Sequence, residues 1–228
     1  GWFFTLHAIA TMIFDSVAFK NVISTGLVLD AKGNKMSKHV GNVTNPFEMM
    51  EKYGADPVRF YMMTNSEPWD NLKFDPEGVD EVRRKFFGTL YNTYSFLALY
   101  ANVDGFDPET MLNQGNLAER PEIDRWIISK ANSLIINVCK QLNDYDPTRA
   151  GRLIDNFVND DLSNWYVRLN RKRFWGKEMD SDKLNAYQTL YSCLMTVAKL
   201  VAPFAPFYAD RLYHDLGGKM ESVHLESY

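Results

Sequence analysis

The sequence predicts a mainly α protein in which the end of an α/β domain is followed by a helical bundle. Two observations carry this prediction. The first part of the chain mixes extended segments, turns and short helices, as the margin of an α/β sheet domain does. Further on, apolar residues recur at the 3.6-residue spacing of amphipathic helices. We therefore expect one domain over residues 1–77 and a second over residues 78–228.

The first domain opens with an apolar stretch over residues 2–14 that predicts a helix. Residues 22–23 and 26–29 are typical of extended segments. Residues 31–34 predict a turn, because their last two residues, a glycine and an asparagine, accept positive φ angles.

Two short helices are expected after this turn. Asn45 suits the N-cap, Pro46 the first helical position and Gly54 the end of the first helix. Asp56 and the proline after it repeat this start for a helix through Tyr61. A helix, extended segments, a turn and further helices are the expected content of the end of an α/β domain.

The second domain contains four stripes of apolar residues, which predict four long helices packed as a bundle. The stripes lie within residues 79–97, 123–142, 150–169 and 184–198. The third stripe includes Trp165 and Tyr166, so we expect both side chains in the core. Residues 101–120 are rich in turn formers and predict a linker. Pro203 and Pro206 end the last long helix, and a short helix is expected after them.

Composition and charge exclude several classes of protein. The 228 residues are 46% hydrophobic and 24% charged, as in ordinary soluble domains, and no apolar run is long enough to span a bilayer. The net charge of −4 does not indicate bulk nucleic-acid binding, so any such surface must be a local patch. Cys139 and Cys193 are isolated, so we interpret them as reduced thiols of a cytosolic protein without a zinc or redox pair.

The chain starts with Gly1-Trp2-Phe3-Phe4, without a methionine and with three aromatic residues in succession. Natural termini are usually polar and frayed. We therefore expect that this chain is a piece of a longer protein, and that residues outside it pack against these aromatic side chains.

The sharpest local motif follows the predicted turn and reads Lys35-Met36-Ser37-Lys38-His39. Two lysines and a serine on a tight loop suit polyanionic phosphate, because lysine supplies a mobile charge and serine a neutral donor. The motif is not a Walker A loop, and no glycine-rich phosphate loop follows a strand, which argues against a kinase-like site. On its residues alone, the motif also fits a solvated lysine turn.

A second motif is basic and lies at the end of the third predicted bundle helix. Ten residues there contain five cations and no acid: Arg168, Arg171, Lys172, Arg173 and Lys177. Such cations contact phosphates, and Trp175 or Phe174 in the same stretch can stack on an unpaired base. Arg149 and Arg152, at the start of the helix, extend the patch. The alternative is a helix end whose cations only favour the helix dipole.

These motifs resemble those of the class I aminoacyl-tRNA synthetases. Residues 35–39 resemble the KMSKS signature of that family, whose loop holds the ATP triphosphate during amino-acid activation. Residues 26–34 before the motif and residues 41–61 after it resemble the segments that flank the signature. The resemblance implies that residues 1–77 are the end of a Rossmann-like catalytic domain with this loop.

The helical part of the chain carries the resemblance further. Residues 124–127, 162–168 and 202–207 resemble the entry, the central helix and a late turn of the family's anticodon-binding bundle. The resemblance therefore covers nearly the whole chain. It implies that residues 78–228 form an anticodon-binding, tRNA-binding domain, and it favours tRNA contact for the basic motif.

Within the class, residues 71–74, 77–79, 90–92 and 222–225 look most like the isoleucyl branch, while valyl and leucyl enzymes share the architecture and stay as alternatives. This branch implies attachment of isoleucine to tRNA(Ile) with ATP, through an aminoacyl-adenylate and with Mg²⁺ in the intact enzyme. It also implies a monomeric, cytoplasmic protein. A free-standing helical module that recognises RNA or protein is a further alternative, although such a module has no use for the lysine motif.

Carried over by position, the resemblance makes Lys38 the main ATP contact and a catalytic residue, together with Lys35. Ser37 joins the phosphate contacts, and the backbone around Met36 lies on the adenine side. His39 departs from the usual final serine; a histidine can still donate to phosphate, and more strongly when it is protonated.

Other parts of the family's machinery are missing from this sequence. It contains no HIGH sequence, and His7 lies in an apolar helix and is interpreted as structural. Trp2 fits either a wall of the adenosine pocket or a core tryptophan. No residues have the spacing of a metal site; Asp155, Asp160 and Asp161 are interpreted as surface charges or arginine partners. We therefore expect that the chain alone does not activate an amino acid.

Overall fold

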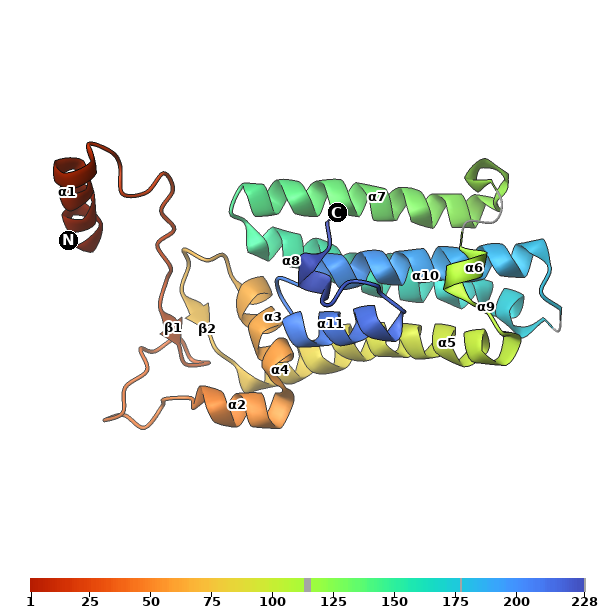
Figure 1. The fold of residues 1–228 in the computed structure, drawn as a ribbon. Helices are drawn as coiled ribbons and strands as arrows, with labels where there is room; N and C mark the ends of the chain where they lie inside the picture. Colours follow the sequence, from red (N-terminus) through yellow and green to blue (C-terminus); the bar gives the residue numbers. More distant parts are fainter. Residues whose placement is uncertain (113–115, 177, 228) are drawn as a thin grey trace.

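The computed structural model describes residues 1–112, 116–176 and 178–227 and is mainly helical, as the sequence predicts. Figure 1 shows a bundle of long helices beside a smaller N-terminal part that holds short helices, two strands and extended segments. Helix α1 (Trp2–Phe14) stands apart at the end of an extended segment, and none of its residues is buried. The helix predicted over residues 2–14 is confirmed.

A short parallel sheet organises the N-terminal part. Strand β1 (Val28–Leu29) pairs with β2 (Leu72–Lys73), with Leu29 opposite Lys73. The backbones approach closely just before β1, because a Cβ on Gly26 would lie 2.1 Å from the carbonyl oxygen of Asp70. Only glycine fits there. Residues 22–23 belong to no strand.

The two helices between the strands begin as their sequences dictate, with one exception. Helix α2 (Pro46–Tyr53) is capped by Asn45, whose side chain accepts the N–H of Phe47 at 3.0 Å. Helix α3 (Ala55–Asn65) begins one residue before Asp56, so Asp56 is not its N-cap as predicted. The buried Asp56 carboxylate instead accepts the N–H of Tyr208, 2.6 Å away in a helix of the bundle. Burial raises the pKa of Asp56, although backbone hydrogen bonds from Tyr208 and Phe207 act in the opposite direction.

The described residues after β2 form four long helical rods, which confirms the predicted bundle (Figure 1). The elements in order are α4 (Pro76–Val82), π-helix η1 (Arg83–Phe87), α5 (Gly88–Asp104), α6 (Pro108–Met111), 3₁₀-helix η2 (Leu117–Glu119), α7 (Glu122–Asn143), α8 (Pro147–Asn156), π-helix η3 (Phe157–Val167), α9 (Arg168–Trp175), α10 (Ser181–Val201), α11 (Pro206–Asp215) and 3₁₀-helix η4 (Val223–Leu225). Elements α4, η1 and α5 form one continuous rod, and α8, η3 and α9 form another. The predicted linker over residues 101–120 includes residues 113–115, which lie outside the described ranges; its described part carries the end of α5 and two short helices.

The apolar residues gather in two cores. The large core lies between the four rods and includes Leu90, Ile127, Ile154 and Leu190, all fully buried. The small core joins β2, α3 and α4, and consists of Val58, Tyr61, Leu72, Phe74 and Val79. The small core therefore fixes the N-terminal part to the start of the first rod.

The N-terminal part also contacts the bundle through α3. The Arg59 guanidinium donates to the carbonyl oxygens of Pro203 at 3.1 Å and Phe204 at 3.2 Å. Helix α8 lies so close to α3 that a Cβ on Gly151 would sit 2.5 Å from the side chain of Thr64. These contacts position the two strands relative to the rods.

The third rod, which consists of α8, η3 and α9, has an unusual pitch. One row of its buried side chains recurs at every fourth residue: Ile154, Val158, Leu162, Tyr166, Asn170 and Phe174. This spacing would drift around an α-helix of 3.6 residues per turn, but the wider turns of η3 keep the row facing inward. Trp165 is consequently 56% exposed, while Tyr166 is buried. The predicted core position is confirmed for Tyr166 and wrong for Trp165.

Within the described residues, none of the helices combines the length and the apolar character that a membrane span requires.

Candidate functional site

The first candidate site is the lysine loop, defined here as residues 35–39, which follows a turn built on Asp30. One oxygen of the Asp30 carboxylate accepts the backbone N–H of Lys32 at 3.0 Å and of Asn34 at 2.7 Å. The other oxygen accepts the side-chain amide of Asn42 at 2.9 Å. The hydrogen bonds from Asn42 and Asn34 lower the pKa of Asp30. The turn predicted over residues 31–34 is confirmed, with Gly33 at a φ of 86°.

Asn42 closes the loop from its far end. Its carbonyl oxygen accepts the N–H of Ser37 at 2.8 Å, and its amide donates to the carbonyl oxygen of Lys35 at 3.3 Å. Because the same amide also reaches Asp30, one side chain ties the two ends of the loop together. Sequence reasoning assigned no role to Asn42, and no local signal indicates its partner, which lies twelve residues earlier in the chain.

The lysine loop presents its charges outward. The side chains of Lys35, Lys38 and His39 are exposed, and the ion pairs among the described residues involve neither lysine. Met36 is partly buried and packs against the small core. The loop is thus held by one apolar side chain and by Asn42, while two ammonium groups stay available to an anion.

The second candidate site is the basic helix, which is α9. Arg168, Arg171, Lys172 and Trp175 are all exposed on it. Phe174 is 1% exposed and packs edge-on against Tyr187, so the idea that Phe174 stacks on a base is wrong. Lys177 lies outside the described residues.

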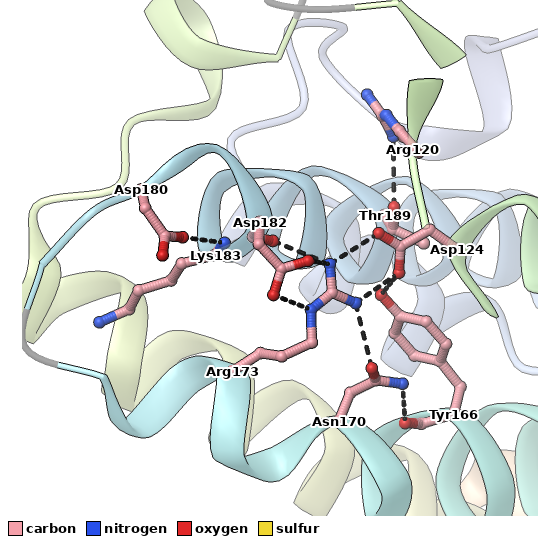
Figure 2. A network of polar contacts seen from close by, with 9 residues as sticks. All are labelled: Arg120, Asp124, Tyr166, Asn170, Arg173, Asp180, Asp182, Lys183 and Thr189. Carbon is pink, nitrogen blue, oxygen red and sulfur yellow. Dashed lines mark hydrogen bonds and ion pairs between the residues drawn. The ribbon is translucent and has the colours of Figure 1, made fainter. Parts of the chain in front are cut away.

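Arg173 has a different environment from its neighbours in the basic helix (Figure 2). Its guanidinium donates to both carboxylate oxygens of Asp124, at 2.7 and 2.8 Å, and the Asp124 side chain is 0% exposed. Its Nε donates to Asp182 at 2.9 Å. These partners lie at the starts of α7 and α10, so Arg173 ties three helices together. Arg173 is therefore not free to contact tRNA as predicted; a bidentate, buried ion pair occupies it.

Two further side chains complete this network (Figure 2). The Tyr166 hydroxyl donates to Asp124 at 2.7 Å, and the Asn170 carbonyl oxygen accepts from Arg173 at 3.0 Å. Burial raises the pKa of Tyr166 well above its usual value, so the phenol stays protonated and donates. Burial alone would lower the pKa of Arg173, but the hydrogen bond and charge of Asp124 outweigh it and the pKa is raised. The network fixes which face of the basic helix points outward.

The two arginines predicted to extend the basic patch lie at the opposite end of the rod. Arg152 donates to the carbonyl oxygens of Thr64 at 2.9 Å and Asn65 at 3.1 Å, at the end of α3. Arg149 is exposed and pairs with Asp146 at 3.2 Å. Both arginines lie in α8, and the whole of η3 separates them from the basic helix. They therefore do not form one continuous patch with it. The structure gives Arg152 a role in joining α3 to α8.

The remaining candidate residues are not gathered into a site. Trp2 is 75% exposed, and His7 lies on the same isolated helix, near the ring of Phe19. Asp161 pairs with Lys130 at 3.1 Å, and Asp155 accepts from Asn159 at 2.8 Å, so these acids have polar partners. In the ranges that the structure describes, histidines, cysteines and acids form no cluster suited to a metal ion.

Two family models match separate parts of the chain. The model described as tRNA synthetases class I (I, L, M and V) matches residues 1–75 and includes the lysine loop. The model described as the anticodon-binding domain of tRNA ligase matches residues 124–228 and includes the basic helix.

Curated relatives match the chain along its length. The isoleucine–tRNA ligase of Bacteroides fragilis NCTC 9343 is 67% identical over 100% of this chain and 20% of the relative. That of Bacteroides thetaiotaomicron VPI-5482 is 70% identical over 95% of this chain and 18% of the relative. That of Porphyromonas gingivalis W83 is 68% identical over 99% of this chain and 20% of the relative. The chain spans about a fifth of the length of these relatives.

Solved structures share the fold at lower identity. A LeuRS of Agrobacterium radiobacter K84, in a ternary complex with tRNA and LeuAMS, matches with a TM-score of 0.67 and 21% identity, over 98% of this chain and 26% of that chain. Methionyl-tRNA synthetase of Mycobacterium tuberculosis, in complex with methionyl-adenylate, matches with a TM-score of 0.70 and 24% identity, over 85% of this chain and 38% of that chain. These structures show the fold, and the two family models together with the relatives show that the chain belongs to the class I aminoacyl-tRNA synthetases.

Proposed function

We propose that this chain is the part of an isoleucine–tRNA ligase that carries the ATP-binding lysine loop and the tRNA-binding bundle. The whole enzyme attaches isoleucine to tRNA(Ile) through an aminoacyl-adenylate made from ATP. The observation that carries the proposal is that isoleucine–tRNA ligases match the chain at 67–70% identity. Because the chain spans only about a fifth of their length, we expect it to be inactive alone.

In the proposed reaction, Lys38 and Lys35 bind the triphosphate of ATP. Charge builds on the leaving pyrophosphate as isoleucine attacks the α-phosphate, and two nearby ammonium groups stabilise that charge. Ser37 and His39 add hydrogen-bond donors at the same loop. The exposure of Lys35, Lys38 and His39 and the tie through Asn42 support this assignment. Mg²⁺ bound to ATP would help to neutralise the same negative charge.

In the second step, the bundle holds the anticodon arm of tRNA(Ile). Arg168, Arg171 and Lys172 are the proposed phosphate contacts, and Trp175 is the proposed stacking residue. Support comes from the match to an anticodon-binding domain and from the exposure of all four side chains. Arg149, which is also exposed, is proposed as a separate phosphate contact at the far end of the rod. We further propose that the enzyme works as a monomer in the cytoplasm.

A free-standing RNA-binding module and a valyl or leucyl enzyme are the alternative functions. Isoleucine-dependent exchange of pyrophosphate into ATP by a full-length ligase that carries this segment separates them. We expect exchange with isoleucine and charging of tRNA(Ile), with much lower rates for valine and leucine. Exchange with valine or leucine instead would assign another branch, and no exchange with any amino acid would overturn the enzymatic proposal.

A further inference from the structure

A pair of tryptophans, one exposed and one partly buried, lies next to the basic helix. Trp165 on η3 is 56% exposed, and its ring centroid lies 6.4 Å from that of Trp126 on α7. The two rings are tilted by 55° and are not stacked on each other, so neither ring fully covers the other's face. Trp126 is partly buried and packs against the large core. Trp165 thus leans on an anchored neighbour while much of its own surface faces solvent.

The surroundings of Trp165 favour a polyanionic partner. From residue 164 to 176 the rod carries four cations and no acid, in a chain with a net charge of −4. Arg173 is neutralised by its carboxylate partners, which leaves three exposed cations. Arg168 and Lys172 lie three and seven positions after Trp165, so in the four-residue repeat they are exposed one position around the rod from its ring. Asp161, four positions before Trp165, is paired with Lys130 at 3.1 Å.

We propose that Trp165, supported by Trp126, is a stacking platform for an unpaired base of the bound tRNA. This inference rests on the proposed function and adds a contact about three turns of helix away from Trp175 along the rod. An aromatic ring held beside phosphate-binding cations is the arrangement that binds unpaired nucleotides. Because Trp126 restricts the ring before tRNA arrives, little side-chain freedom is lost on binding.

The platform predicts a specific pattern in a full-length ligase that carries this segment. Trp165→Ala should raise the KM for tRNA(Ile) about tenfold, the value of one stacked base, and leave isoleucine-dependent pyrophosphate exchange unchanged. Trp165→Phe, which keeps a ring, should restore most of the loss. Phe207→Ala is the matched control, because Phe207 is an exposed ring on α11 outside both candidate sites.

Salt dependence separates stacking from charge and from a folding defect. Trp165→Ala should weaken tRNA binding equally at all salt concentrations, because no phosphate contact is lost. Lys172→Ala should instead reduce the slope of log affinity against log salt by about one. An unchanged KM for Trp165→Ala in an enzyme that performs normal exchange would overturn the platform alone. Loss of exchange in the unsubstituted enzyme would instead overturn the proposed function.

A protein surface covering the platform is the competing outcome. Acrylamide quenching of Trp165 fluorescence, measured as the difference between the full-length enzyme and its Trp165→Phe variant, detects it. We expect Trp165 to be quenched in the free enzyme and protected by tRNA(Ile). A Trp165 that is already protected without tRNA would show that another part of the protein covers it, and the proposal would be wrong.

Discussion

The lysine loop and the basic helix both present cations, yet they are held in opposite ways. The lysine loop has one partly buried apolar side chain, Met36, and depends on hydrogen bonds through Asn42 at the surface. The basic helix rests on the large core and on the buried pair of Arg173 with Asp124. Rearranging the lysine loop therefore costs little free energy, whereas rearranging the basic helix costs much more.

This difference fits what each site is proposed to do. A loop that stabilises charge only during a reaction benefits from the freedom to close on its substrate. A surface that reads the position of a large RNA must keep its cations at fixed spacing. The comparison predicts that substitutions at the basic helix act mainly on stability or tRNA binding, and that those at the lysine loop act mainly on the rate of activation.

The largest expected effect is at Arg173. Arg173→Ala leaves the buried Asp124 carboxylate without its cation, which should lower the free energy of unfolding by about 3–5 kcal/mol. Urea denaturation followed by circular dichroism measures the change. Arg211→Ala breaks an exposed pair with Asp215 and should cost less than about 0.5 kcal/mol. Equal losses in the free energy of unfolding would show that the buried ion pair of Arg173 holds the basic helix no more firmly than an exposed ion pair does.

Lys38→Ala should come next. In a full-length ligase that carries this segment, it should lower the rate of pyrophosphate exchange about 100-fold, close to 3 kcal/mol of transition-state stabilisation. Isoleucine binding and the free energy of unfolding should change little, because Lys38 is exposed. Lys32→Ala in the neighbouring turn is the matched control. A normal exchange rate for Lys38→Ala would contradict the role given to the loop.

Asp104 tests the bundle through its pH dependence. Burial pushes the pKa of Asp104 up, but hydrogen bonds from Lys183 and Tyr187 outweigh it and leave the pKa below the usual 3.8. The pair therefore contributes stability above the unfolded pKa, and that stability is lost as pH falls through the folded pKa. Asp104→Asn should cost about 2 kcal/mol at pH 7 and progressively less as the pH falls below 3.8. A cost independent of pH would mean that charge is not involved.

Asn42→Ala should have the smallest effect on stability and a selective effect on activation. Loss of the tie between Asp30 and the lysine loop should slow exchange about tenfold, or 1.4 kcal/mol. The free energy of unfolding should shift by no more than about 0.5 kcal/mol, as for most surface substitutions. Asn156→Ala, an exposed asparagine of the bundle, serves as the control. A large loss of stability in Asn42→Ala would show that the loop is part of the folded framework.

Much of the fold was predictable because its signals are local. The cap at Asn45 and the turn before the lysine loop follow from residues within four positions of one another. The four rods follow from apolar stripes, since burial of one helix face is periodic along the sequence. Asp56 misled the prediction because an aspartate before a proline normally caps its own helix, whereas this one accepts from α11, far along the chain.

The candidate sites were predictable in place but not in detail. Arg173 and Arg168 look alike in sequence, and only the three-dimensional position of Asp124 separates an anchored arginine from a free one. Asn42 escaped notice because its partners are set by how the loop folds back. Trp165 was misplaced because the prediction assumed the 3.6-residue period, while the buried row of this rod recurs at every fourth residue.

The wide turns of η3 also limit which insertions and deletions the third rod can tolerate. Removing one residue within η3 would rotate everything after it by about 90°, one position of the four-residue repeat. Asn170 and Phe174 would then leave the core, and Arg171 and Trp175 would take their buried places. Insertions and deletions should therefore be tolerated in connections such as residues 143–147 and be selected against within the third rod. A family that keeps this rod at constant length is preserving the orientation of its outer face.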